Sequence, residues 1–234
     1  RKDHVMEFAQ IGANIVKIMR DYWKVFLIEG VSTTLILTCI AVSLGAILGT
    51  LVAIMKMSRF RLLRVIVTAY VEIIRGTPIL LQLYIFYFCL PQMLPFLKLS
   101  AFMWVAIAMC VNSSAYVSEV IRSGIQAVDK GQTEAARSLG LSSGQTMRKV
   151  VLPQAVKNIL PALGNEFIIL LKDTSLIIVI GGKELLYAAQ GVYGRTYEQM
   201  FPLIGIACIY LLLVMLFSWL QSLLERRLRQ SDRR

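Results

Sequence analysis

The chain has 234 residues, 57% of them hydrophobic, and a formal charge of +11. A mean hydropathy of +0.66 is too high for a soluble domain of this size, so the composition predicts an integral membrane protein. The basic residues stand in short segments beside apolar tracts, as in cytoplasmic loops, and this argues against a nucleic-acid-binding protein. Four cysteines without a CxxC pair and a single histidine predict no metal site.

The N-terminal segment, residues 1–26, is predicted to be an amphipathic helix that lies at the membrane interface on the extracytoplasmic side. Apolar residues recur there at helical spacing between charged ones: Phe8, Ile11, Ile15, Ile18 and Tyr22. The transmembrane domain is expected to cover residues 27–225, and residues 226–234 form a basic tail.

Five apolar tracts are long enough to cross the bilayer, which needs about 20 residues of helix. They cover approximately residues 27–55, 65–90, 101–121, 158–180 and 201–224. We therefore predict an all-α membrane protein with five transmembrane helices. In the first tract Gly45 and Gly49 stand four residues apart, a spacing that either lets another helix approach closely or only makes this helix flexible.

The basic residues predict the orientation of the chain. Residues 56–64, 122–157 and the tail hold four, six and five Lys or Arg and would share one side of a five-span protein. The opposite side holds basic residues diluted by acids in the N-terminal segment, and few beyond it. Because positive charge marks the cytoplasmic side, the N-terminus is expected outside and the C-terminus in the cytoplasm.

A polar island over residues 122–157 separates the third and fourth spans. Asp129 and Ser142 are placed as helix N-caps, Gly140 is placed to end the first helix, and Pro153 marks a break before the fourth span. The pattern predicts two short cytoplasmic helices at about residues 129–153. A simple connection needs only a handful of residues, so this length indicates a docking surface.

Three blocks of the sequence resemble one known family. "EAARSLG" at 134–140, followed by "VVLP" at 150–153, resembles the EAA motif of ABC-importer permeases. "VEIIRGTP" at 71–78 and "LPQAVKNILPALGNEFIILLKDTSL" at 152–176 are similar to the polar amino acid subfamily. The resemblance implies the type I ABC importer permease fold. It also implies that the site coupled to the ATPase contains Glu134, Ala135, Ala136 and Gly140.

The same resemblance implies partners. They are a dimer of ABC ATPase subunits that binds ATP and Mg, a second permease forming a homo- or heterodimer, and an extracytoplasmic amino acid-binding protein or fused binding domain. The chain itself lacks the phosphate-binding loop G-x-x-x-x-G-K-[ST], so it is not expected to be an enzyme or to hold a cofactor. A bacterial cytoplasmic membrane is the implied location.

Ionisable residues inside apolar tracts are costly and are therefore candidates for function. Glu72 and Arg75 are spaced to pair on a helix, and "RGTP" predicts a broken helix beside a pathway or an ion pair that holds the bundle together. Glu166 and Asp173 stand about two helical turns apart on one face, where they either bind substrate or join subunits. The candidate substrate-binding residues are Glu166, Asp173, Asn165, Thr174, Ser175, Arg75 and Thr77.

The predicted function is thus the permease subunit of an ATP-driven importer for polar amino acids. A preference for basic ones such as arginine, lysine or histidine is a further hypothesis, based on the two acids in one span. The alternative is an ion-coupled secondary amino acid transporter, which would show internal inverted repeats that we do not see. A membrane-embedded enzyme would need clustered acids or histidines, and this chain has scattered acids and one histidine.

Overall fold

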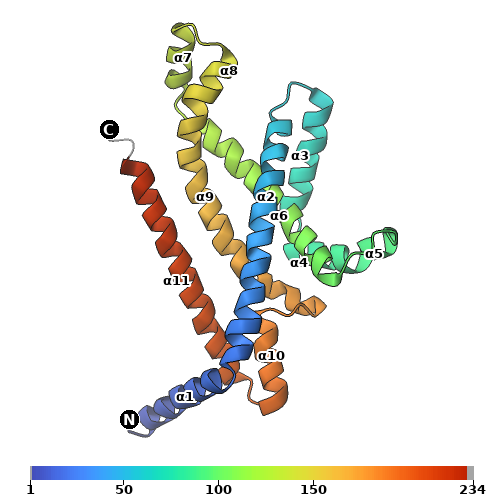
Figure 1. The fold of residues 1–234 in the computed structure, drawn as a ribbon, viewed down its shortest axis with the longest axis vertical. Coiled ribbons are helices and arrows are strands. Elements are labelled where there is room, and N and C mark those ends of the chain that lie inside the picture. The colour runs from blue at the N-terminus through green and yellow to red at the C-terminus, as the bar shows by residue number, and fades with distance from the viewer. Residues whose placement is uncertain (1, 231–234) are drawn as a thin grey trace.

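Backbone polar groups at membrane depth must pair within their own segment, which favours helices in apolar tracts. In the computed structural model, which describes residues 2–230, every regular element is helical (Figure 1). In chain order the elements are α1 (Lys2–Asp21), η1 (Lys24–Val31), α2 (Ser32–Lys56), α3 (Arg61–Arg75), α4 (Ile79–Tyr84), η2 (Ile85–Cys89), α5 (Leu90–Met93), α6 (Ala101–Gln126), α7 (Lys130–Ser138), α8 (Ser143–Thr146), η3 (Met147–Val151), α9 (Leu152–Asp173), η4 (Thr174–Ile180), α10 (Leu185–Thr196) and α11 (Met200–Gln230).

Three helical stretches of the described chain are long and apolar enough to cross a membrane: Lys24–Lys56, Ala101–Gln126 and Met200–Leu228. A fourth candidate is the pair Arg61–Arg75 and Ile79–Met93, which is bent by 103°. The expected span at 158–180 is not among them, because charged and polar residues interrupt the apolar run of α9. The count of five spans therefore stays a prediction.

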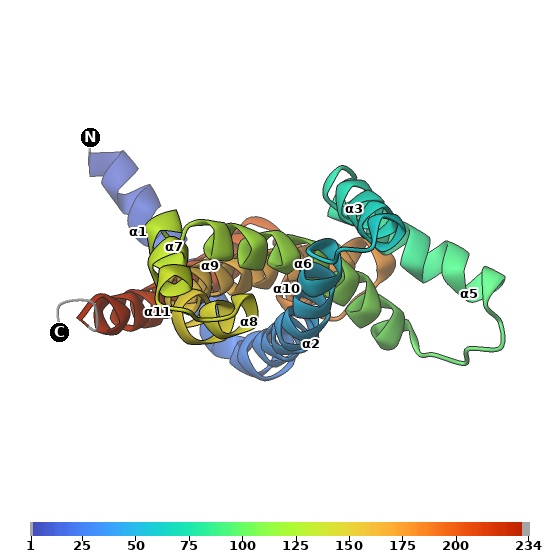
Figure 2. The same ribbon diagram turned by 90° about the horizontal axis from the view of Figure 1, so that it is seen from above.

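The long helices run between two ends of the molecule (Figure 1). The turn between α2 and α3, the helices α7 and α8, and the C-terminal end of α11 lie at one end, and α1 and α10 lie at the other. The basic segments at 56–64 and 122–157 thus share one end, as their charge predicts. Seen along the long axis, the α5 arm extends to the side away from α1 and α11 (Figure 2).

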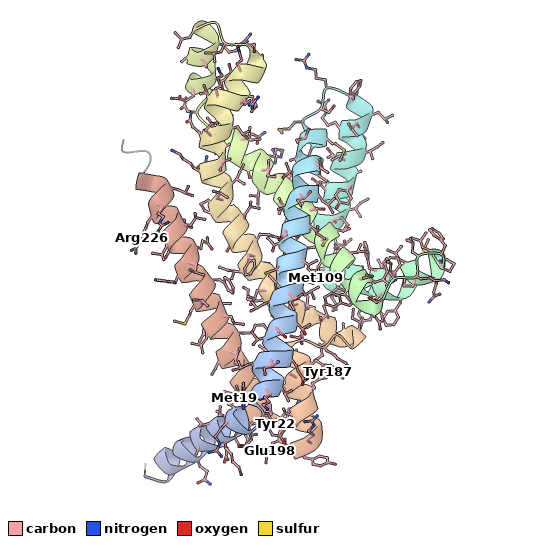
Figure 3. All side chains as sticks on the ribbon, viewed as in Figure 1. Met19, Tyr22, Met109, Tyr187, Glu198 and Arg226 are labelled. Carbon is pink, nitrogen blue, oxygen red and sulfur yellow. The ribbon has the colours of Figure 1, made fainter. Side chains whose placement is uncertain are left out.

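The most extensive contact between two helices is that of α2 with α6, and small residues allow their close approach. A Cβ atom added at Gly49 would lie 2.7 Å from Val117 Cβ and 2.9 Å from the carbonyl oxygen of Ser114, and one added at Gly45 would overlap the Ser113 side chain. The close approach predicted from the glycine spacing is confirmed. The buried side chains of Leu37, Met109 and Leu170 belong to one core cluster between α2, α6 and α9, and Figure 3 labels Met109.

A second cluster joins the helices at the opposite end. Phe26, Leu185 and Val192 are fully buried there, and Met19 and Tyr22 pack against them from the end of α1 and the residue after it (Figure 3). The fully buried carboxylate of Glu184 caps α10 by accepting from the Tyr187 N–H at 2.9 Å, and the Tyr210 hydroxyl of α11 donates to it at 2.7 Å. Burial raises the pKa of Glu184 above its usual range.

Two sequence-based expectations about local structure are wrong. The break expected at Pro153 is absent, since the chain is helical from Ser143 to Asp173. Pro153 lies in the first turn of α9, directly after the π-helical turn η3. A missing N–H is tolerated at this position. Residues 181–200 separate the last two apolar tracts, and their glycines and tyrosines predict a loop, but they contain the helix α10. The first residues of the expected tail, 226–230, continue α11, while residues 231–234 lie outside the described part of the chain.

The α2–α6 contact gives a test of the fold. Gly49→Leu should lower the free energy of unfolding by about 1–3 kcal/mol, because a side chain there must displace Val117 and the α6 backbone. Thermal unfolding in detergent, followed by intrinsic tryptophan fluorescence, measures the change. Gly191→Leu is the matched control, since a Cβ there meets no atom within 4 Å. Equal melting temperatures for the two variants would contradict the close packing.

Candidate functional site

A broken helix is the centre of the candidate site. Gly76, Thr77 and Pro78 separate α3 from α4, and Pro78 has no N–H to donate to the carbonyl of Ile74 one turn earlier. The buried Gln82 replaces that donor: its Nε2 lies 2.7 Å from the Ile74 oxygen and 3.1 Å from the Thr77 carbonyl oxygen. The carbonyl oxygens of Ile74 and Thr77 at the bend are therefore paired within the protein, as membrane depth requires.

Asn112 on α6 fixes the orientation of this glutamine. Its Nδ2 donates to Gln82 Oε1 at 2.9 Å, and both side chains are buried. The amide group of Gln82 thus points its nitrogen at the bend and its oxygen at α6. Neither residue was predicted from the sequence. The available signal was a glutamine four residues after a proline within an apolar tract.

A cavity of about 400 Å³ opens beside the bend. Its lining residues are Arg75, Gly76, Thr77, Pro78, Ile79, Asn112, Tyr116, Glu166, Ile169 and Asp173. Four predicted candidates are thereby brought together from two helices, α3 and α9, and the bend. Glu166 is 6% exposed, and within the described chain no ion pair or hydrogen bond ties down its carboxylate. The cavity therefore offers a buried carboxylate to whatever enters it.

Three predicted substrate-binding residues do not line this cavity. Asn165 is exposed on another face of α9. The Thr174 hydroxyl donates to the Leu171 carbonyl oxygen at 2.8 Å, and the Ser175 hydroxyl donates to that of Lys172 at 2.7 Å. Both hydroxyls follow the local preference of Ser and Thr for nearby backbone carbonyls where α9 passes into the 3₁₀-helix η4.

An ion cluster stands next to the cavity. Glu119 of α6 pairs with Lys56 Nζ at 2.6 Å, with Arg122 Nη2 at 2.6 Å and with Arg75 Nη1 at 3.8 Å. The Arg75 guanidinium also lies 5.4 Å from the centre of the Tyr116 ring. The ion pair of Arg75 is therefore with α6, and not with Glu72 on its own helix as its spacing suggested.

The caps and the turn of the polar island, residues 129–145, have the local structure that the sequence predicts. The Asp129 carboxylate accepts from the Gly131 N–H at 2.6 Å, Gly140 takes a left-handed φ of +85° after α7, and Ser142 with Gln145 forms a capping box. Within the motif Ala136 is buried, whereas Glu134, Ala135 and Gly140 are exposed. Leu139 beside them is 82% exposed, so this end presents an apolar side chain next to an exposed acid.

The match to a family model decides what this arrangement is. Residues 41–230 match the family described as "binding-protein-dependent transport system inner membrane component". The chain belongs to this family. It is the permease subunit of an ABC importer, as the three sequence blocks indicate.

Relatives and solved structures agree with this membership. The permease is 44% identical over 212 residues to a putative glutamine transport system permease protein of Rickettsia conorii, covering 90% of this chain and 97% of the relative. It is 42% identical over 207 residues to the arginine transport system permease protein ArtQ of Bacillus subtilis, covering 88% of this chain and 94% of the relative.

The permease also resembles a crystal structure of an amino acid ABC transporter with histidines, at 46% identity and a TM-score of 0.85, covering 89% of this chain and 96% of that one. An inward-facing structure of the MetNI methionine ABC transporter has a TM-score of 0.70 at 20% identity, covering 87% of this chain and 96% of that one, and shows the shared fold alone. The predicted all-α permease fold is confirmed.

The side-chain amide of Gln82, which donates across the bend, should be required for the stability of the bend. Gln82→Leu leaves the carbonyl groups of Ile74 and Thr77 unpaired, so we expect a loss of about 1–3 kcal/mol. Unfolding by heat or denaturant in detergent measures it. The matched control is Gln190→Leu at an exposed position of α10. A Gln82 variant as stable as the control would show that other groups satisfy the bend.

Proposed function

We propose that this permease belongs to an ATP-driven importer for polar amino acids, and that the substrate passes through the cavity at the α3–α4 bend. The observation that carries the proposal is the composition of the lining: the acids Glu166 and Asp173 come from α9, and the base Arg75 comes from the end of α3. An amino acid has an ammonium group and a carboxylate, which match these two kinds of charge. Such contacts are stronger in a partly buried cavity than in bulk water.

The ratio of charges supports a preference for basic amino acids. Two carboxylates and one guanidinium line the cavity, so a substrate with two positive groups and one carboxylate would compensate all of them. Asn112 and the backbone at the bend add polar groups that a side-chain amide could also use. Relatives named for glutamine and for arginine transport fit either kind of side chain. Arginine, lysine and histidine are the substrates that we propose first.

The proposed complex contains two permeases, identical or different, two ATPase subunits that bind ATP and Mg, and an extracytoplasmic binding protein or fused domain that delivers the amino acid. It lies in the bacterial cytoplasmic membrane with five spans, the N-terminus outside and the C-terminus in the cytoplasm. The end that carries α7 and α8 would contact the ATPase through Glu134, Ala135, Ala136 and Gly140. An ion-coupled carrier, the alternative considered from the sequence, is disfavoured both by the family match and by the exposed island.

The acids of the cavity give the test of this function. In vesicles containing the assembled complex and internal ATP, Glu166→Gln and Asp173→Asn should each reduce uptake of L-arginine at least about tenfold, since about 1.4 kcal/mol of binding corresponds to that factor. Substrate-stimulated ATP hydrolysis should fall in parallel. Glu72→Gln, an exposed acid of α3 outside the cavity, is the control.

Two results would contradict the proposal. Normal uptake and stimulation by both cavity variants would show that the two acids only hold the helices together. Uptake driven by an ion gradient in vesicles without ATP would support the ion-coupled carrier.

The coupling surface gives an independent test. Glu134→Arg reverses an exposed charge beside Leu139 and should reduce co-purification of the ATPase, and transport with it, about tenfold. Gln190→Arg introduces the same side chain at the opposite end of the molecule and should change neither quantity. If the Glu134 variant retains the ATPase and transports normally, this residue has no part in the coupling surface.

A further inference from the structure

Arg75 belongs to two neighbouring sites at once. It lines the cavity, and it reaches Glu119 in the ion cluster beside it. The inference drawn from this position rests on the proposed function, because it assumes that a substrate carboxylate occupies the cavity.

The ion cluster holds Arg75 more loosely than its other cations. Lys56 occupies Glu119 Oε1 at 2.6 Å, and Arg122 occupies Oε2 with two nitrogen atoms at 2.6 and 3.0 Å. Arg75 is the third cation on this carboxylate and stands 3.8 Å from Oε2. The Glu119 side chain is only 14% exposed, so water screens the repulsion among the three cations incompletely. Of the three cations, Arg75 therefore loses the least electrostatic stabilisation when it moves away from Glu119.

The ion cluster also stands where a change could reach the ATPase. Lys56 is the last residue of α2, and Glu119 and Arg122 lie in the last turns of α6. Only three residues separate the end of α6 at Gln126 from the start of α7 at Lys130. The ion pairs of Lys56 and Arg122 with Glu119 thus determine how firmly the ends of α2 and α6 are held together beside the coupling helices.

We propose that Arg75 reports occupancy of the cavity to the coupling helices by leaving Glu119 when a substrate carboxylate binds. A carboxylate in the cavity attracts the guanidinium away from the ion cluster. Lys56 and Arg122 then hold Glu119 without the repulsion of a third cation, and the ends of α2 and α6 tighten against each other. Arg75 is in this sense a positioning residue that links the substrate to ATP hydrolysis.

Removing the third cation should imitate the occupied state. In the assembled complex, Arg75→Met should raise ATP hydrolysis without substrate about fivefold, the lower end for coupling between two sites, and addition of L-arginine with the binding protein should raise it no further. Arg64→Met, an exposed arginine of the same helix, is the matched control and should behave like the unmodified protein. A role in substrate binding alone would leave the rate without substrate unchanged, and that result overturns the proposal.

A second variant separates this link from the substrate site. Glu119→Gln weakens the ion cluster but leaves the cavity lining intact. It should bind L-arginine at least as tightly as the unmodified complex in equilibrium dialysis, because Glu119 no longer competes for Arg75, yet show no stimulation of ATP hydrolysis. Normal stimulation in Glu119→Gln overturns the link, even if Arg75→Met fails to assemble. Failure of the proposed function is distinct from both, because it appears as a normal response in Glu166→Gln and Asp173→Asn.

Discussion

The need to pair backbone groups at membrane depth shapes this permease more than any other constraint. Pro78 leaves the Ile74 carbonyl without a helical donor, and a bend of 103° at this depth is tolerated only if another group takes that place. Gln82 does so, and Asn112 holds Gln82 in position. The bend and the cavity beside it thus depend on one amide. The side chain that permits the broken helix also attaches it to α6.

The helix α6 connects the other parts of the structure through two of its faces. Ser113 and Val117 receive the glycines of α2 on one face. Asn112, Tyr116 and Glu119 follow at helical spacing along another face, where they contact Gln82, Arg75 and the ion cluster in turn. From the cavity towards the end of α6 that precedes α7, one stripe of α6 thus carries a series of polar contacts that reaches Arg122.

Much of this arrangement could be predicted from local signals. The caps at Asp129 and Ser142, the left-handed glycine at 140 and the Gly45–Gly49 spacing each state a backbone requirement within a few residues, and all are confirmed. The periodicity of α10 was available too, because Leu185, Ala188, Ala189 and Val192 form a buried stripe. Glycines and tyrosines in that segment led to its interpretation as a loop.

The partners of the charged residues were not predictable in the same way. Arg75 has an acid three residues before it, so the sequence favours a pair within α3, whereas the structure gives it Glu119 from α6, 44 residues later along the chain. The ion-pair partner of Arg75 depends on how the end of α3 is oriented towards α6 at the bend, and no local sequence pattern encodes that angle. The same holds for Thr174 and Ser175, whose hydroxyls turn to nearby carbonyls where α9 narrows into η4. A membrane protein places its ionisable groups through tertiary contacts, so the sequence can identify the costly residues but not which of them meet.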